Sequence, residues 1–166
     1  PPIHAHPITA PQPHSGGEVQ HLGQWDPGDV AGPVDPDRRV GAIYLDGGTQ
    51  HVCTGSVLHS PAGNLVLTAA HCLAGAAQIT FVPGLSGTTP PADLWTADMV
   101  YLDPRWLASK DPHADYAIAR VNSEHSGSVE SHAGLALTLG PAPPPGSHVT
   151  VVGYPTGVGG SPIGCQ

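Results

Sequence analysis

Residues 53–72 read "CTGSVLHSPAGNLVLTAAHC" and decide how the rest of the chain is interpreted. Two β-rich apolar runs, 49–60 and 65–70, flank the turn signal "PAGN", which predicts two neighbouring strands. His71 follows the second run at once and precedes Cys72. On these residues alone, His71 fits a packed core residue, a metal ligand or a general base. A base needs a position that is fixed by its neighbours beside an open cleft.

The rest of the chain also consists of short β-rich runs between turn-forming residues. It contains 22 Gly and 20 Pro, and only 11% of its residues are charged, which leaves little surface for helices. Short strands between turn signals predict an all-β sandwich or barrel, and they argue against βαβ units. Further strands are predicted at 39–45, 76–84, 97–104, 115–121, 134–140 and 147–155.

Composition excludes several classes of function. The chain has 166 residues, which suits one domain with a tail, and its formal net charge is -8. An acidic chain with five basic side chains lacks the positively charged surface through which proteins bind nucleic acids and anionic membranes. No apolar stretch approaches the roughly 20 residues that span a bilayer, so no membrane span is expected. No cofactor is expected either.

Residues 1–37 differ in composition from residues 38–166. They are rich in Pro and His and lack an alternating apolar pattern, so they bury too little surface to offset their ordering entropy. We interpret them as an arm that serves as a propeptide or linker. Four histidines of this arm offer the alternative of a metal site, but their spacing matches no defined ligand set, and no metal is expected. These histidines are His4, His6, His14 and His21.

Three cysteines occur, Cys53, Cys72 and Cys165. The first two lie in or beside neighbouring predicted strands, so they are the natural disulfide pair, and the alternative is two buried thiols in a reducing compartment. A disulfide indicates an oxidising location. The sequence therefore predicts a secreted or extracytoplasmic protein in which Cys165 has no internal partner.

Asp115 is the candidate partner for His71. It opens the apolar strand of "DYAIARV" (115–121), where a carboxylate is costly unless it is paired. A carboxylate that holds one ring nitrogen of a histidine fixes the tautomer that a general base needs. The alternative is an ordinary turn residue.

Residues 53–72 resemble the active-site histidine region of the trypsin-like serine proteases, which carries T-A-A-H-C with its two cysteines bridged. "DPHADYAIARV" (111–121) is similar to the aspartate segment of that family, and "VTVVGYP" (149–155) resembles the strand that begins its second barrel. The "GYP" detail resembles the bacterial trypsin-like and glutamyl-endopeptidase-like branch. The resemblance implies a chymotrypsin-like double β-barrel with His71 as general base and Asp115 as its orienting partner.

The chain departs from the family pattern at the nucleophile. No G-D-S-G-G or G-T-S-G-G motif occurs, and Ser161 in "GVGGSPIG" (157–164) lies too soon after the "VVGYP" strand. Pro162 also offers no N–H for an oxyanion hole. The resemblance therefore implies a first barrel at 38–125, and a connector with the start of an incomplete second barrel at 126–166. The serine and the partner of Cys165 would lie in a C-terminal part that is cut from this segment or continues beyond it.

Two functions are consistent with this interpretation. The first is a serine endopeptidase that acts on protein or peptide substrates, uses the C-terminal part as its partner and is inactive without it. The second is a pseudoprotease, a barrel of the same kind that has lost its nucleophile and serves as a binding module.

Overall fold

A computed structural model describes residues 4–7, 31–87, 94–124, 127–157 and 159–165, with backbone pairing alone for 4–7. It contains mainly short strands with three short helices and one 3-10 turn, η1. The strands are β1 (His4–Pro7), β2 (Gly32–Pro33), β3 (Val40–Leu45), β4 (Cys53–Leu58), β5 (Leu65–Thr68), β6 (Ile79–Pro83), β7 (Trp95–Leu102), β8 (Ala117–Asn122), β9 (Val151–Gly153) and β10 (Ile163–Cys165). The helices and the turn are α1 (Ala70–Leu73), α2 (Pro104–Ser109), η1 (Pro112–Ala114) and α3 (Val129–Ala133).

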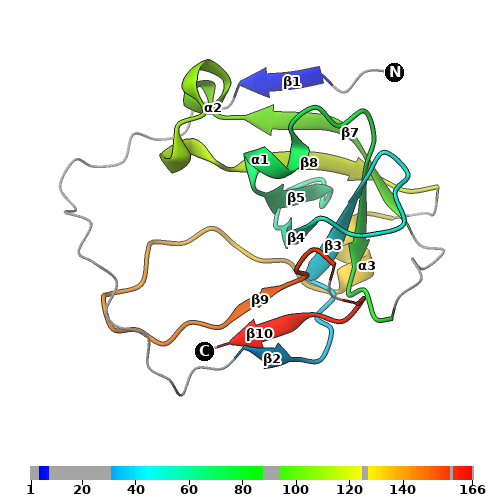
Figure 1. The fold of residues 1–166 in the computed structure, drawn as a ribbon, viewed down its shortest axis with the longest axis vertical. Coiled ribbons are helices and arrows are strands. Elements are labelled where there is room, and N and C mark those ends of the chain that lie inside the picture. The colour runs from blue at the N-terminus through cyan, green and yellow to red at the C-terminus, as the bar shows by residue number, and fades with distance from the viewer. Residues whose placement is uncertain (1–3, 8–30, 88–93, 125–126, 158, 166) are drawn as a thin grey trace.

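Six strands close into a barrel, which confirms the all-β prediction. They have the order β7-β6-β3-β4-β5-β8, and β8 pairs back onto β7, always antiparallel. Closure leaves few unpaired strand edges. The remaining strand of this sheet, β1, pairs in parallel with residues 99–102 of β7 (Figure 1). All six barrel strands overlap the predicted runs between 39 and 121.

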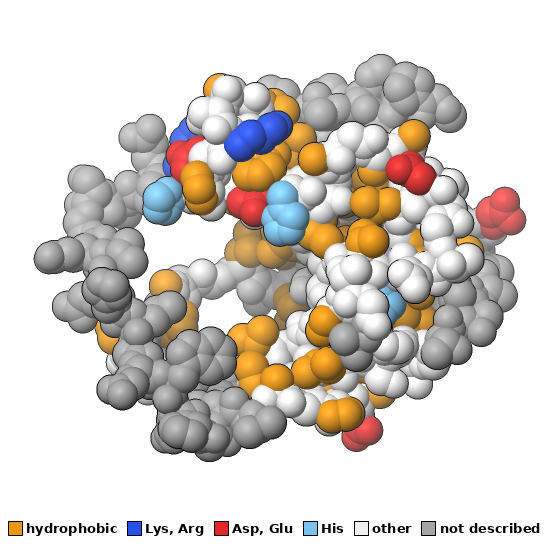
Figure 2. Space-filling model, in the orientation of Figure 1, with side chains coloured by type: hydrophobic (Ala, Val, Ile, Leu, Met, Phe, Trp, Pro, Cys, Tyr) orange, Lys and Arg blue, Asp and Glu red, His pale blue; other side chains and the backbone are white. Residues whose placement is uncertain are grey.

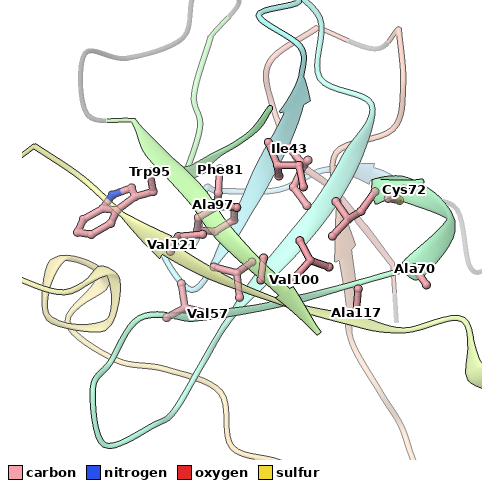
Figure 3. Packing of buried hydrophobic residues seen from close by; sticks show 14 of the residues in the cluster. Ile43, Val57, Ala70, Cys72, Phe81, Trp95, Ala97, Val100, Ala117 and Val121 are labelled. Atoms are coloured by element: carbon pink, nitrogen blue, oxygen red, sulfur yellow. The ribbon is translucent and has the colours of Figure 1, made fainter. Parts of the chain in front are cut away.

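Alternating side chains of these strands fill the barrel interior. Ile43, Val57, Phe81 and Val121 are almost completely buried and point toward one another between the strands (Figure 3). Full burial of such a side chain contributes about 1.5–3 kcal/mol. This core fixes the strand register, and the register in turn fixes which loops meet at the end of the barrel.

Two glycines make room for Phe81. Gly41 of β3 lies opposite Gly55 of β4 in the register. A Cβ on Gly41 would lie 2.5 Å from the Phe81 ring, and one on Gly55 would lie 2.7 Å from Val66 and 3.1 Å from Phe81. Gly55, the glycine of the Gly-Ser pair in β4, is therefore required by the packing of this barrel.

A second, three-stranded sheet has the order β2-β10-β9 (Figure 1). It is attached to the barrel through Tyr154, which comes directly after β9 and is 2% exposed. The backbone N–H of Tyr154 donates to the Thr54 hydroxyl at 2.8 Å, and its own hydroxyl donates to the Leu85 carbonyl at 3.0 Å. Burial raises the pKa of Tyr154 to about 12. Since Tyr154 packs with Ala42 and Tyr44 of β3, β3 is buried on both faces.

The structure departs from the predicted elements at several points. Residues 134–140 form a single bridge, Leu58 to Leu137, in place of a strand, because Gly134 ends α3 with a φ of 80° and prolines come after the segment. Residues 163–165 pair as β10, which was not predicted. Asp103 is the N-cap of α2, which begins at Pro104, so the helix starts within the stretch 97–104 that was expected to be a strand.

Parts of the predicted arm, 1–37, also take part in the sheets. Residues 4–7 pair with β7, and residues 32–33 pair with β10. The arm histidines His14 and His21 lie outside the described residues, and for His4 and His6 only the backbone is described. Among the described residues, no helix is long and apolar enough to cross a membrane.

Candidate active site

The strand register brings His71 and Asp115 together. In the antiparallel pair of β5 and β8, Thr68 lies opposite Ala117. The residues that come after β5 and those that precede β8 therefore leave the barrel at the same end. His71 lies three residues after Thr68, in α1, and Asp115 lies two residues before Ala117, at the end of η1.

Two hydrogen bonds join these residues. The backbone N–H of His71 donates to Oδ1 of Asp115 at 2.8 Å, and Nδ1 of the His71 ring lies 2.7 Å from Oδ2. This arrangement is that of a ring which donates its Nδ1 proton to the carboxylate, so that Nε2, which lies 3.6 Å from Sγ of Cys72, is the nitrogen that can accept a proton. The His71 side chain is 62% exposed, whereas that of Asp115 is 27% exposed. The ring can therefore meet a reactant, while the carboxylate is held behind it.

The pKa of Asp115 reflects two opposing effects. Burial raises it, whereas the hydrogen bonds from the side chain and backbone of His71 and from the Ala70 backbone lower it. The hydrogen bonds prevail, so the pKa of Asp115 lies below its usual range. Asp115 is thus a carboxylate at neutral pH, ready to stabilise a positive charge on the His71 ring.

A buried carboxylate that sequence reasoning missed supports this pair. Asp103 is 3% exposed and caps α2 by accepting from the Arg105 backbone N–H at 2.8 Å. Its oxygens also accept from the Arg105 guanidinium at 2.9 and 3.1 Å, and from the Tyr116 hydroxyl at 2.6 Å. Tyr116 is the next residue after Asp115, so this network anchors the segment that carries it. An Asp before Pro104 is a helix-start signal that could have revealed the cap.

The Arg105 guanidinium, the Tyr116 hydroxyl and the Arg105 backbone hold the pKa of Asp103 well below its usual range. Burial opposes this change. Asp103 is therefore charged at all ordinary pH values, and its ion pair with Arg105 persists.

The predicted disulfide between Cys53 and Cys72 is confirmed, and it ties β4 to α1 beside His71. In the described part of the chain these three residues are also the group whose donor atoms lie close enough to hold a metal ion, within 4.8 Å of one another. The two sulfurs are bonded to each other, so neither offers a thiolate, and the group does not fit a metal.

Two further residues singled out from the sequence lie in the second sheet. Cys165 is a free, half-buried cysteine in β10. Ser161 is exposed and precedes the buried Pro162. Its own N–H donates back to the Gly159 carbonyl at 2.6 Å, and Pro162 has no N–H, so this turn does not provide the pair of donors that an oxyanion hole needs.

Comparison with known proteins assigns the family. A family model described as a trypsin-like peptidase domain matches residues 53–163, and the chain belongs to this family. The match begins at Cys53 of the disulfide and includes both His71 and Asp115. The closed six-strand barrel and the start of a second sheet are accordingly the first barrel and part of the second in a chymotrypsin-like fold.

Solved structures agree with this assignment. The protease Anisep from Arthrobacter nicotinovorans is 26% identical, with a TM-score of 0.71 over 82% of this chain and 66% of that one. A Glu endopeptidase solved with MPD is 18% identical, with a TM-score of 0.66 over 82% of this chain and 66% of that one, and supports the fold.

A curated relative is the "Extracellular metalloprotease" of Bacillus subtilis (strain 168), which is 28% identical over 117 residues. The match covers 68% of this chain and 36% of the relative. The chain thus spans about a third of the curated relative and just under two thirds of the structural ones.

Proposed function

We propose that the chain contributes the histidine and the aspartate of a serine endopeptidase. The observation that carries this proposal is the 2.7 Å contact between Nδ1 of His71 and Oδ2 of Asp115, at the end of the barrel where β5 ends and β8 begins. The His71 side chain is 62% exposed, as a ring that takes a proton from a nucleophile must be. Membership of the trypsin-like peptidase family supports the same reaction.

In this mechanism His71 moves one proton. Its Nε2 takes the proton from a serine hydroxyl as the serine oxygen attacks a peptide carbonyl, and the ring becomes positively charged. Asp115 stays ionised and stabilises that charge through the Nδ1–H hydrogen bond. His71 then gives the proton to the leaving amine, which breaks the peptide bond and leaves an acyl-enzyme. Water, activated by the same ring, releases the acyl group.

The serine itself is proposed to lie in a C-terminal part outside this sequence. Apolar side chains of the connector and of β9 support this, because they remain exposed where a further part of a second barrel would pack. Figure 2 shows a hollow between the side chains over α1 and α2 and the hydrophobic side chains over the second sheet. The exposed apolar residues are Leu135, Leu137, Leu139, Val149 and Val151.

Cys165 gives this C-terminal part a second point of attachment in the proposal. It lies half-buried in β10 without a partner among the described residues, and a disulfide from it would tie the two parts together. The Cys53–Cys72 disulfide and the extracellular relative support a secreted or extracytoplasmic location.

Hydrolysis without a metal is the chemistry that this site favours, although the curated relative is named a metalloprotease. Three described residues have donor atoms close enough together to hold a metal, and two of them, Cys53 and Cys72, are bonded to each other, which leaves His71 as a single ligand. A metal chelator should therefore leave activity unchanged.

Peptide cleavage by the full-length protein tests the function. We expect wild type to cleave a broad peptide library with or without EDTA, and His71→Ala to lose at least about a thousandfold in kcat/KM. His113→Ala is the matched control, because that ring is exposed and pairs with Asp111 instead. Equal cleavage by wild type and His71→Ala would contradict the assignment. No cleavage by wild type would favour the pseudoprotease.

A further inference from the structure

Asp115 lies at the centre of a sharp turn between η1 and β8. η1 ends at Ala114 and β8 begins at Ala117, so Asp115 and Tyr116 form the whole link. Asp115 has a φ of −79° and a ψ of 61°, and the Tyr116 N–H donates to the Ala114 carbonyl at 2.9 Å. These values are those of an inverse γ-turn. Because a single internal hydrogen bond closes such a turn, contacts from outside it are needed to fix the direction of the Asp115 carboxylate.

The Tyr116 side chain supplies such a contact. Leu102 of β7 lies opposite Ala117 of β8, so the next residues outward, Asp103 and Tyr116, leave the barrel at the same end. The Tyr116 hydroxyl donates to Oδ2 of Asp103 at 2.6 Å. A hydrogen bond of this length from a hydroxyl to a carboxylate belongs to the strong, charge-assisted class. The link that carries Asp115 is therefore tied to the start of α2.

The acceptor of this hydrogen bond is itself fixed in place. Asp103 is 3% exposed, and its two oxygens also accept from the backbone N–H and the guanidinium of Arg105 at 2.8, 2.9 and 3.1 Å. The carboxylate is thus held against rotation. Burial, and after it the hydrogen bond to Asp103, raise the pKa of Tyr116 above its usual value, so the phenol remains a donor at neutral pH.

The barrel should remain folded without this hydroxyl. Ala117, the first residue of β8, is completely buried and pairs with Thr68 of β5 on one side and with Leu102 of β7 on the other. Asp103 would keep its hydrogen bonds to Arg105. The loss of the hydroxyl is therefore confined to the link between η1 and β8.

A displacement of that link would reach the proposed base directly. The Asp115 oxygens lie 2.8 Å from the backbone nitrogen of His71 and 2.7 Å from its Nδ1. A misplacement of about 1 Å among catalytic groups can reduce the rate roughly a hundredfold. Smaller displacements should have smaller but measurable effects.

We propose that Tyr116 is a positioning residue for the catalytic pair: its hydroxyl, anchored on Asp103, keeps the Asp115 carboxylate against both N–H groups of His71. Its effect on catalysis passes through Asp115, since the hydroxyl itself is engaged by Asp103. This inference rests on the proposed peptidase function and adds a residue to its machinery.

Tyr116→Phe tests the inference in the full-length protein, with a peptide amide as substrate. We expect kcat to fall about three- to tenfold, because the Asp115 carboxylate is still present but less well placed. KM should stay within about twofold, because the hydroxyl is not proposed to bind substrate. Tyr101→Phe is the matched control, since it removes the hydroxyl of another half-buried tyrosine, in β7 opposite Ile118. Unchanged kcat in Tyr116→Phe would overturn the inference.

A double-mutant cycle shows whether Tyr116 acts through Asp115. In an Asp115→Asn background the productive ring tautomer is already lost, so adding Tyr116→Phe should change kcat/KM by less than about twofold. If the full loss caused by Tyr116→Phe also appears in that background, Tyr116 acts by another route and the inference is overturned.

Proton NMR separates this inference from the peptidase proposal, because it needs no catalysis. The proton between Nδ1 of His71 and Asp115 is deshielded by its short hydrogen bond, and its resonance is identified by its absence from His71→Ala. The resonance should move upfield in Tyr116→Phe and stay in place in Tyr101→Phe. If it moves as expected while wild type cleaves no peptide, the peptidase proposal alone is contradicted. An unmoved resonance in Tyr116→Phe would overturn the positioning role even where wild type cleaves.

Discussion

At the scale of single residues, the contact between His71 and Asp115 predicts a loss of activity on mutation that a purely structural role would not cause. An Asp115→Asn variant still accepts the His71 backbone N–H, but its amide favours the opposite tautomer of the ring. We expect kcat/KM of the full-length protein to fall by roughly 10³–10⁴, the range for such changes in related triads. Asp111→Asn, which alters the partner of His113, should stay within about twofold. Near-normal activity of Asp115→Asn would remove Asp115 from the mechanism.

Asp103 predicts how stability depends on pH. Its folded-state pKa is lowered, so its contribution is present above the pKa of an unfolded Asp, about 3.9, and is lost as the pH falls toward the folded value. The free energy of unfolding should therefore decrease between pH 5 and pH 2. In Asp103→Asn that decrease should be smaller, whereas in the exposed Asp35→Asn it should match wild type. Urea unfolding at several pH values measures this, and equal pH profiles for all three proteins would contradict it.

At the scale of elements, the paired glycines of β3 and β4 fix the barrel wall. A Cβ on Gly41 would lie 2.4 Å from the Val82 carbonyl and 2.5 Å from the Phe81 ring. We expect Gly41→Ala to destabilise the fold by about 1–3 kcal/mol, the usual range for overpacking. Gly32→Ala is the control, since nothing lies within 4 Å of a Cβ there. Thermal unfolding would show the difference, and equal midpoints would contradict this packing account.

The sequence predicted the strands of the barrel better than the segments that join them. Alternating apolar residues identify β3 to β8 because each strand has one face in the barrel core. The segment 134–140 has the same pattern, but Leu135 and Leu139 remain 67% and 74% exposed in the described structure. Pattern alone does not report whether a partner strand exists.

For the candidate site too, some residues were predicted from the sequence and others were missed. His71 and Asp115 were predicted because motifs mark them. The network of Asp103, Arg105 and Tyr116 was missed, because it depends on a helix cap and on burial that no periodic pattern signals.

At the scale of the whole molecule, the described structure combines a closed barrel with a small second sheet. Tyr154 fixes that sheet to β3 and β4, so the second sheet has a defined place beside the first barrel. Leu139, Val149 and Val151 leave an apolar surface on the connector and β9. The proposal that a C-terminal part packs there, and brings the serine to His71, is the central claim of this account.

Labelling with a serine-directed fluorophosphonate tests that claim most directly. Full-length wild type, His71→Ala and the control His113→Ala are incubated with the probe, and intact mass and peptide mapping locate the label. We predict one label on wild type and on His113→Ala, at a serine outside residues 1–166, and loss of labelling in His71→Ala. A label on Ser161, equal labelling of His71→Ala, or no label on wild type would contradict the account.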